Sequence, residues 1–387
     1  MMGKRNKICI VTTIETTMEA FVIPAMRVFV EKGYEVSLIC TMSDSFKEKY
    51  SGEFNLIPVN MVRGISVKEM LTKPFEFYRI FKKEKFDYVQ YATTNASFYA
   101  ALPARLLGIK TRVYCSWGLL YVGYKGLKRT LLKWVEKYLC WSATYITVAS
   151  RKNLEYAVAD GLFPADKASV VGDGGTVGVD LNEFSYSKRG EYKDEVLKEY
   201  PVLKDKTVFG YVGRIERDKG IQELLEGFLG LNNPECVLLL VGPFDELRCN
   251  LNPELIQRAK ACENVIFHGF AREVPKYMSA MDILVHPTYR EGFSMVIQQA
   301  MAMGCAVVTT DIPGPSEVIV DGESGVLVPP YSTEELVSAM AYLVESEDKR
   351  EVLAQNALER VRMLFNRERM VRLTYENRIK LLTKQNV

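Results

Sequence analysis

Histidine is nearly absent from this sequence, and two familiar binding patterns are missing. The 387 residues include only two histidines, His268 and His286. The first half of the chain therefore has no histidine to act as a base or to contact a sugar. The loop after the first expected strand lacks GxGxxG, and DxD occurs nowhere. These absences argue against a dinucleotide site and against a metal held by an aspartate pair.

Long hydrophobic runs are also missing. No stretch approaches the roughly 18 uncharged apolar residues that span a bilayer, and the basic start of the chain runs straight into a short strand with no signal-peptide pattern. Eight cysteines are scattered without CxxC or CxxH spacing, so we expect reduced core thiols rather than a metal site. The sequence predicts a cytoplasmic protein.

Net charge is nearly zero, with 50 basic and 48 acidic residues, and gives no indication of a nucleic-acid partner. Residues 1–185 carry 25 Lys and Arg against 18 Asp and Glu, which leaves 25 against 30 for the rest. A basic half can approach an anionic surface. An ordinary fluctuation between two solvated surfaces explains the charge equally well.

Two segments of the basic half interleave aromatic and basic residues, Lys73–Phe86 and Tyr114–Trp141. Basic amphipathic helices with this composition can lie on an anionic membrane face. Helices that pack their aromatics inward and leave lysines in water have the same composition. Together with the charge asymmetry, the segments suggest peripheral contact of the N-terminal half with the inner membrane.

The length and the order of elements predict two α/β domains. A chain of 387 residues is too long for one ordinary core. It opens with a strand–helix–strand unit, in which Lys7–Thr13 is a strand, IETTMEA is a loop and the helix covers about Phe21–Lys32. A second series of strands begins at Thr207–Gly213. We therefore predict a doubly wound sheet in each half of the chain.

The most informative stretch is Arg290–Gly314, REGFSMVIQQAMAMGCAVVTTDIPG. Its spacing predicts a loop, a nearly all-apolar helix and a buried strand. Glu291 lies on the loop, ahead of free backbone N–H groups near Phe293, Ser294 and Met295 that form an anion site. The helix carries two large polar groups, Gln298 and Gln299, and each needs a partner because an unpaired buried amide costs roughly 1–3 kcal/mol.

A second motif, GRIERDKGI, follows the strand Thr207–Gly213 and delivers Arg214 and Lys219 to the mouth of a helix. Ligands of open α/β sheets bind beyond the carboxyl ends of strands. Arg214 as a planar fork and Lys219 as a point charge suit a diphosphate. Alone, such a pair is more often surface charge. His286, just before the Glu291 loop, either lines the site or has a structural role.

These motifs resemble the donor-site signature of retaining GT-B glycosyltransferases, the family-4-like group that includes many bacterial polysaccharide and lipid-linked oligosaccharide transferases. The signature has two acids eight apart. Glu291 matches the first, whereas Gln299 stands at the second and keeps only one accepting oxygen. GRIERDKGI matches the family's diphosphate motif. Val177 replaces an Asn of the family's turn between domains, and Trp117-Gly118 stands where related enzymes often have His-Gly.

The resemblance implies a GT-B fold with two facing Rossmann-like domains. Its expected parts are an acceptor-binding domain over 1–184, a linker over 185–206, a sugar-nucleotide-binding domain over 207–366 and a helix over 367–387 that packs back on the first domain. It implies transfer of a hexose or N-acetylhexosamine from a nucleoside diphosphate sugar, with UDP preferred. The acceptor is a glycan or a polyprenyl-diphosphate-linked sugar, the configuration is retained, and neither metal nor cofactor is needed.

The resemblance also assigns roles to residues. The catalytic residues would be Glu291, Arg214 and Lys219. The donor would contact these three and Gly292, Phe293, Ser294, Met295 and Gln299. The acceptor and cleft loop would include Thr13, Glu15, Thr16 and Trp117.

Two alternatives share this fold. A non-catalytic nucleotide-sugar-binding subunit of a transferase complex is suggested by the departures at Gln299, Trp117 and Val177. A sugar-nucleotide epimerase needs acid–base residues that the histidine-free first half does not obviously offer.

Overall fold

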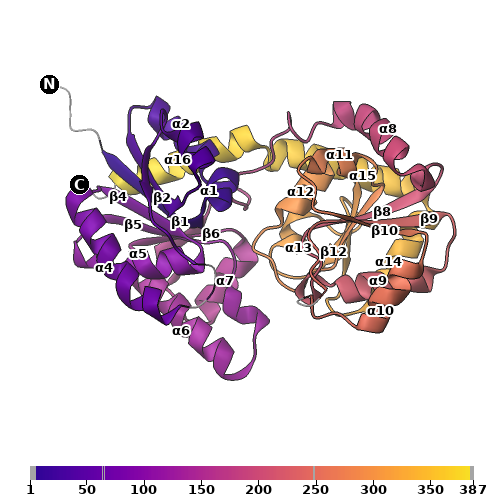
Figure 1. Ribbon diagram of the computed structural model, residues 1–387, viewed down its shortest axis with the longest axis horizontal. Helices are drawn as coiled ribbons and strands as arrows, with labels where there is room; N and C mark the ends of the chain where they lie inside the picture. Colours follow the sequence, from indigo (N-terminus) through magenta and orange to yellow (C-terminus); the bar gives the residue numbers. More distant parts are fainter. Residues whose placement is uncertain (1–5, 63, 65, 247–248, 384–387) are drawn as a thin grey trace. The chain divides into compact units, whose positions relative to one another are not determined.

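The computed structural model divides the chain into two compact α/β units, drawn in Figure 1. The first unit comprises Met1–Val177 and Arg367–Val387, and the second comprises Gly178–Asn366. The structure describes residues 6–62, 64, 66–246 and 249–383. Each unit has one parallel sheet covered by helices, which confirms the predicted fold class.

The first unit contains a parallel sheet of seven strands in the order β3-β2-β1-β4-β5-β6-β7. Its central strands are almost continuously apolar, as expected for a parallel sheet that is buried on both faces. The order reverses between β1 and β4, so the carboxyl ends of these two strands form a topological switch point. The strands are β1 Lys7–Ile14, β2 Glu35–Thr41, β3 Asn55–Pro58, β4 Tyr88–Ala92, β5 Thr111–Ser116, β6 Tyr145–Val148 and β7 Ala168–Val170.

Two hydrophobic clusters, one on each side of this sheet, hold its helices. The last helix, α16, packs beside α2, as Figure 1 shows, and buries Leu381 and Leu382. This confirms the predicted return of the C-terminal helix. The helices are α1 Glu15–Phe21, α2 Ile23–Glu31, α3 Asp44–Tyr50, α4 Val67–Glu84, α5 Thr94–Leu106, α6 Gly126–Ser142, α7 Arg151–Ala159 and α16 Arg367–Thr383, with short 3-10 turns η1 Leu120–Gly123 and η2 Ala165–Lys167.

The predicted loop IETTMEA was wrong, because it folds as helix α1 directly after β1. Met18 is fully buried on this helix, and Glu15 occupies its first turn, where a carboxylate is favoured by the helix dipole. Tertiary packing of one apolar side chain therefore outweighs the weak helix propensity of the threonines.

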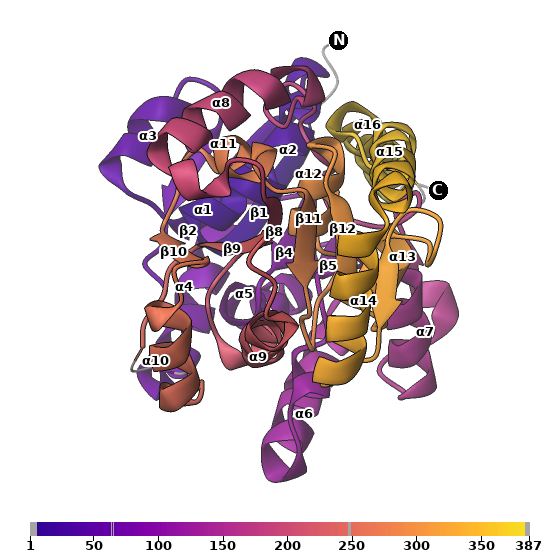
Figure 2. The same cartoon turned by 90° about the vertical axis from the view of Figure 1, so that its right-hand side faces the viewer.

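The second unit has a parallel sheet of six strands in the order β10-β9-β8-β11-β12-β13. Its switch point lies between β8 and β11, and α14 and α15 pack beside β12, as Figure 2 shows. The strands are β8 Thr207–Val212, β9 Cys236–Val241, β10 Val265–Gly269, β11 Ile283–His286, β12 Ala306–Thr310 and β13 Val326–Val328. The helices are α8 Arg189–Glu199, α9 Ile221–Leu231, α10 Pro253–Ala261, α11 Val274–Ser279, α12 Met295–Ala302, α13 Pro315–Val318, α14 Thr333–Glu345 and α15 Glu347–Leu364, with 3-10 turns η3 Tyr186–Lys188, η4 Pro201–Leu203 and η5 Arg217–Lys219.

Residues 185–206, predicted as a linker, instead belong to the second unit, because α8 packs against α11 there. The guanidinium of Arg189 donates to the backbone carbonyls of Ser279, Met281 and Gly304 and so ties α8 to this unit. The composition of the segment is charged, but one buried valine, Val196, gives the helix its packing contact. Across the described residues, no helix combines the length and low charge needed to cross a bilayer.

Candidate functional site

The predicted donor-site residues meet at the switch point of the second unit. β8 leads into Arg214 and Lys219, and β11 ends at His286 and leads into Glu291. Because β8 and β11 are paired neighbours in a parallel sheet, their carboxyl ends lie at the same edge. Crevices at such switch points are where open α/β sheets bind ligands.

Glycines allow the loops at this edge to touch. Gly220 has φ +69°, and a Cβ there would overlap the carbonyl oxygen of Pro287. A Cβ at Gly242 would likewise overlap the carbonyl of Gly213. Only glycine fits such close backbone contacts without a shift of the loops. The loop of Lys219 therefore packs directly on the loop of Glu291.

Lys219, His286 and Glu291 form one polar cluster. Nζ of Lys219 donates to Oε1 of Glu291 at 2.5 Å, and Nε2 of His286 lies 3.4 Å from the same oxygen. The ring of Tyr211 stacks on His286 with centroids 5.9 Å apart. Burial raises the pKa of Glu291, but the hydrogen bond from His286 and the charge of Lys219 outweigh burial and lower it to about 2. Glu291 is therefore a carboxylate at neutral pH.

Arg214 lies at the same edge and is the more exposed cation, with 57% of its side chain accessible. It is paired with Glu216, whose two carboxylate oxygens each lie 2.5 Å from Nη1. The hydroxyl of Tyr211 donates to the carbonyl of Arg214 at 2.8 Å and fixes the loop. The sequence did not identify Glu216, although it stands two residues after Arg214 in the diphosphate motif.

The amino end of α12 has free backbone donors, as predicted. Ser294 caps the helix, and its Oγ accepts from the N–H of Ile297 at 3.4 Å. Within the described part of the chain, the N–H groups of Phe293, Ser294 and Met295 donate to no other residue. Gly292 is buried, and the ring of Phe293 packs edge-on against Phe365 at 5.3 Å. The phenyl ring of Phe293 is therefore buried.

The two glutamines of α12 differ sharply in environment. Gln298 is 1% exposed, and its Nε2 donates to the carbonyl of Ser294 at 3.0 Å. Its Oε1 has no hydrogen-bond partner among the described residues. Gln299 is half-buried, and no hydrogen bond from its side chain to a described residue occurs. Its amide is thus available to a ligand.

The predicted acceptor residues lie in the first unit and are not one cluster of contacts. Thr13, at the end of β1, hydrogen-bonds Thr93 through its N–H at 3.1 Å and its hydroxyl at 2.7 Å. This contact spans the β1/β4 switch point. Thr93 has φ +65°, which is unusual for a β-branched residue, and nothing in the sequence indicated it.

The other three acceptor candidates have different surroundings. The carboxylate of Glu15 accepts from the N–H of Ser43 at 2.5 Å, whereas Thr16 is exposed. Both lie in helix α1 and not in a loop. Trp117 follows β5 and packs against Phe21, with ring centroids 5.3 Å apart.

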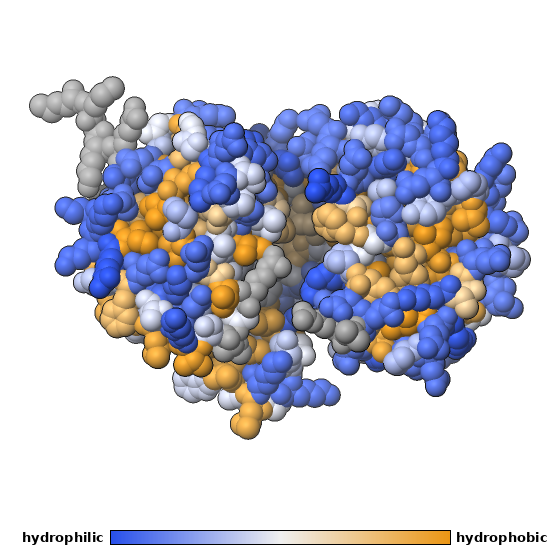
Figure 3. Space-filling view, in the orientation of Figure 1, coloured by the Kyte–Doolittle hydropathy of each residue, from blue (hydrophilic) through white to orange (hydrophobic). Residues whose placement is uncertain are grey.

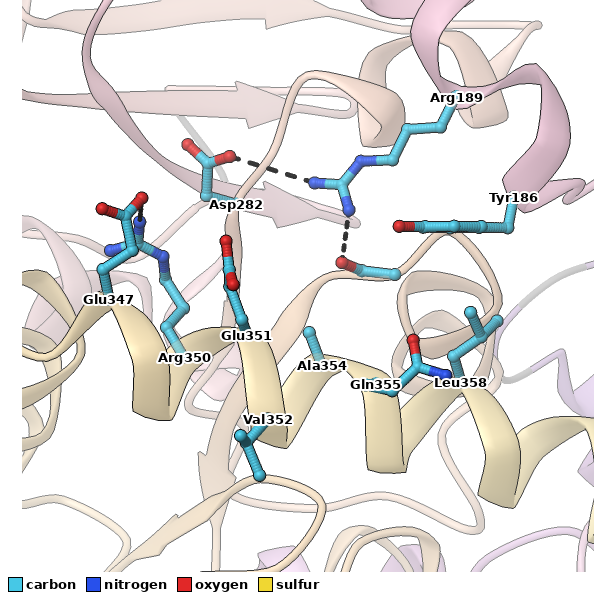
Figure 4. A pocket seen from close by; sticks show the side chains of 11 residues that line it. Tyr186, Arg189, Asp282, Glu347, Arg350, Glu351, Val352, Ala354, Gln355 and Leu358 are labelled. Carbon is cyan, nitrogen blue, oxygen red and sulfur yellow. Dashed lines mark hydrogen bonds and ion pairs between the residues drawn. The ribbon is translucent and has the colours of Figure 1, made fainter.

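A cavity of about 520 Å³ lies elsewhere in the second unit. Figure 4 shows it between Arg189 and helix α15, beside Asp282. Asp282 precedes β11 and Gly304 precedes β12, so this cavity lies at the amino edge of the sheet. Arg189 is already bound to three carbonyls there. The cavity is therefore a poorer match to a donor site than the carboxyl edge.

Metal ligands do not gather in the described part of either unit. No group of three or more His, Cys, Asp or Glu side chains is arranged to hold a metal ion there. The cationic groups at the carboxyl edge of the second unit include Arg214 and Lys219, which are suited to anionic oxygens.

Comparison with known proteins covers both units. Residues 193–360 match the family described as glycosyl transferases group 1, and residues 18–174 match the glycosyl transferase 4-like domain. The capsular polysaccharide biosynthesis glycosyltransferase CapM of Staphylococcus aureus is 27% identical over 350 residues, which cover 89% of this chain and 90% of CapM.

Two further relatives extend the comparison. The UDP-Gal:alpha-D-GlcNAc-diphosphoundecaprenol alpha-1,3-galactosyltransferase of Escherichia coli is 22% identical over 324 residues, 81% of each chain. The crystal structure of Anabaena Alr3699/HepE in complex with UDP and glucose superimposes with a TM-score of 0.81 at 19% identity and covers 97% of this chain and 100% of that one.

Proposed function

This chain belongs to the GT-B glycosyltransferases of group 1, and from that premise we propose that it transfers a hexose or N-acetylhexosamine from a UDP-sugar, with retention of configuration. The acceptor is a glycan or a lipid-linked sugar of surface polysaccharide biosynthesis. The observation that carries the proposal is the cluster of Lys219 and Glu291 beside Arg214 at the β8/β11 switch point.

The two cations provide the electrostatic part of the reaction. When the bond between sugar and diphosphate breaks, negative charge develops on the leaving diphosphate. Arg214 and Lys219 stabilise that charge, and the free N–H groups at the start of α12 add further donors. These groups do the work that a divalent cation does at other sites, so we propose that the reaction needs no metal.

Glu291 positions the donor sugar. Its pKa, lowered to about 2, keeps it ionised, so it accepts hydrogen bonds from sugar hydroxyls. The side-chain oxygen of Gln299 accepts a hydrogen bond from one ribose hydroxyl, and its NH2 group donates a hydrogen bond to another oxygen of the donor. We assign no enzymic nucleophile. A hydroxyl oxygen of the acceptor attacks the anomeric carbon on the face that the diphosphate leaves. The bond from the anomeric carbon to the diphosphate breaks, and the hydroxyl proton passes to the leaving diphosphate, so the configuration is retained.

The choice of donor and acceptor is supported by relatives. The E. coli relative is named for UDP-Gal and for a diphosphoundecaprenol-linked sugar, and the Anabaena structure holds UDP and glucose. For this chain we propose that the second unit binds a uridine nucleotide. The first unit binds a sugar acceptor, which is either free or linked to a lipid.

We further propose that the first unit lies peripherally on the cytoplasmic face of an anionic membrane. One face of α6 exposes Leu127, Leu131 and Trp134 to 90%, 62% and 67%. Lys128 and Lys137 flank this face and approach the rings of Tyr124 and Trp134. Figure 3 shows hydrophobic surface along the lower part of this unit, where Figure 1 draws α6. Apolar residues bordered by lysines are typical of interfacial helices.

Membrane contact is tested by sedimentation with vesicles of phosphatidylglycerol and phosphatidylcholine. Leu127→Ser with Trp134→Ser should release the protein from anionic vesicles. Val352→Ser is the control, because Val352 is also an exposed apolar residue, at 55%, but lies on α15 of the second unit. Equal binding of all three proteins would refute this surface.

The donor site is tested by calorimetric titration of UDP and GDP, each with and without EDTA. We expect saturable binding of UDP that EDTA leaves unchanged. Transfer from UDP-hexoses to lipid-linked and free sugars is then followed by proton NMR, in which the anomeric coupling of the product reports retention. UDP binding without turnover would favour a non-catalytic subunit, and binding of neither nucleotide would reject the proposed site.

A further inference from the structure

Arg378 on α16 carries a buried positive charge in the first unit. The residue is 4% exposed. Its Nε donates to Oε1 of Gln90 at 2.9 Å, and its Nη2 donates to Oγ1 of Thr147 at 3.2 Å. Nη1 donates to Oδ1 of Asn377 at 2.6 Å, and Nη2 also contacts Sγ of Cys115 at 3.5 Å. All four partners are uncharged groups.

No carboxylate compensates this charge within the described residues. Arginine does not release its proton in a folded protein. Removing such a charge from water carries a penalty of several kcal/mol unless an opposite charge is close. Asp173, an acid in the loop after β7, is paired with Arg369 at 2.8 Å. Arg378 therefore has hydrogen bonds but no counter-charge.

A small cavity of about 30 Å³ adjoins Arg378. Trp117, Ala149 and Val171 line it, and each directly follows a strand, β5, β6 and β7 respectively. The cavity thus lies at the carboxyl edge of the sheet. Its volume accommodates about one water-sized group, and partly exposed Trp117 and Thr176 connect it to the surface.

The surroundings favour a negative occupant. Helix α7 begins at Arg151, two residues after Ala149, so its positive dipole end lies beside the cavity. Thr147 and Thr374 add hydroxyl groups to the lining. Trp117 supplies an aromatic face of the kind on which a sugar ring can pack. A small anionic group attached to a sugar matches all three features.

We propose that the cavity beside Arg378 binds one oxygen of a carboxylate that is carried by the sugar acceptor. This inference rests on the proposed function, because it names the chemistry of the acceptor. Neutral acceptors would leave the cavity to water and the guanidinium uncompensated. The enzyme therefore selects acidic acceptors over neutral ones.

The test uses the fluorescence of Trp117 in the full chain. The sequence has three tryptophans, so Trp134→Phe with Trp141→Phe leaves Trp117 as the only reporter. Saturating UDP is present throughout to occupy the donor site. The probes are sodium glucuronate, inorganic phosphate, glucose and, at equal ionic strength, sodium chloride. We expect a saturable change with glucuronate and no saturable change with glucose or chloride.

Two variants connect the response to the cavity. Arg378→Gln should weaken glucuronate binding about 10- to 100-fold, the loss expected for a charge-assisted hydrogen bond. Thr374→Met fills the cavity and leaves Arg378 in place, so it should abolish the response even if Arg378→Gln folds poorly. Circular dichroism and UDP binding check that both variants are folded.

The outcomes separate this inference from the proposed function. UDP binding without a glucuronate response would overturn the acidic acceptor and leave the donor site standing. A response to phosphate alone would also overturn it, because the site would then take a free inorganic ion. An equal response to glucose, to chloride or in Arg378→Gln would contradict it too. Absence of UDP binding counts against the proposed function instead.

Discussion

Nζ of Lys219 lies 2.5 Å from Oε1 of Glu291, although the two residues follow different strands of the sheet. Arg214 is likewise paired with Glu216. Both cations assigned to the diphosphate therefore have carboxylate partners within the chain. A nucleotide exchanges these ion pairs for new ones, so its net affinity is smaller than the number of charge contacts suggests.

Replacement of Glu291 by Gln should separate binding from turnover. The neutral side chain no longer competes for Lys219, so UDP affinity should stay the same or rise, by up to about fivefold for a partly exposed ion pair. Transfer from a UDP-sugar should fall about 100-fold or more, because a positioned partner of the donor sugar is lost. Calorimetry with UDP and single-turnover rates measure the two effects.

The control for Glu291→Gln is Glu235→Gln. Glu235 forms an ion pair with Lys206 at 2.8 Å, at the amino edge of the same sheet. Its loss should change neither UDP affinity nor the transfer rate. A Glu291→Gln protein with wild-type turnover would remove Glu291 from the reaction.

Replacement of Arg214 by Ala should weaken UDP binding by about 1.5–3 kcal/mol, because its bond to phosphate is charge-assisted. Isothermal titration without metal measures the change. Lys206→Ala removes a cation that precedes β8, whereas Arg214 follows it, so this variant controls for charge alone. Equal affinities of the wild type and Arg214→Ala would exclude Arg214 from the donor site.

The sequence predicted the positions of Arg214, Lys219 and Glu291 in the fold because two local motifs specify them. Arg214 and Lys219 follow one buried strand and Glu291 follows another, and parallel strands bring their carboxyl ends together. Their positions needed only periodicity and the topology of doubly wound sheets. The start of α12 is likewise indicated by Ser294 and by the apolar residues that follow it.

Other features depend on contacts that no local pattern encodes. The hydrogen bond of His286 to Glu291 needs the loop to fold back on the strand end. Thr93 adopts a positive φ because Thr13 holds it from another strand. The buried charge of Arg378 arises only when α16 packs on the first sheet, 288 residues after Gln90. Such long-range pairings escape analysis of residue spacing.

Restoring the acid by Gln299→Glu should not lower activity, and the KM for the UDP-sugar should stay equal or fall. The side chain of Gln299 is half-buried and bonds no described residue, so a carboxylate there breaks no existing contact and can accept from both ribose hydroxyls. Steady-state kinetics with the UDP-sugar measures the effect. A dead but folded variant would contradict the assigned role.

The neighbouring Gln298→Glu is the matched control. Gln298 is 1% exposed, and its Nε2 donates to the carbonyl of Ser294. A carboxylate loses that donor and buries an unpaired charge, which should destabilise the second unit by about 3 kcal/mol or more. Thermal unfolding should therefore shift for Gln298→Glu and remain nearly unchanged for Gln299→Glu.

Stability of the first unit should depend on pH through Glu136 on α6. Glu136 is 6% exposed and accepts from the hydroxyls of Tyr114 and Ser116 at 2.8 and 3.3 Å. Burial raises its pKa from 4.5 to about 7, since these two hydrogen bonds only partly offset it. The native state thus holds a proton that the unfolded state releases.

The contribution of Glu136 to the free energy of unfolding is therefore greatest below about pH 4.5. It falls as the pH rises to about 7 and is constant above that pH. The loss in the free energy of unfolding is on the order of 3 kcal/mol.

Because Trp117, Trp134 and Trp141 all belong to the first unit, tryptophan fluorescence during urea unfolding at pH 5 and 7.5 reports this unit. Glu136→Gln should remove the difference, since a neutral amide stays uncharged at both pH values. Glu291 does not contribute to this signal, because it lies in the other unit. Its pKa is lowered, so the stability that it adds to that unit is lost only as the pH falls below about 4.5. An unchanged pH dependence in Glu136→Gln would assign the effect to another group.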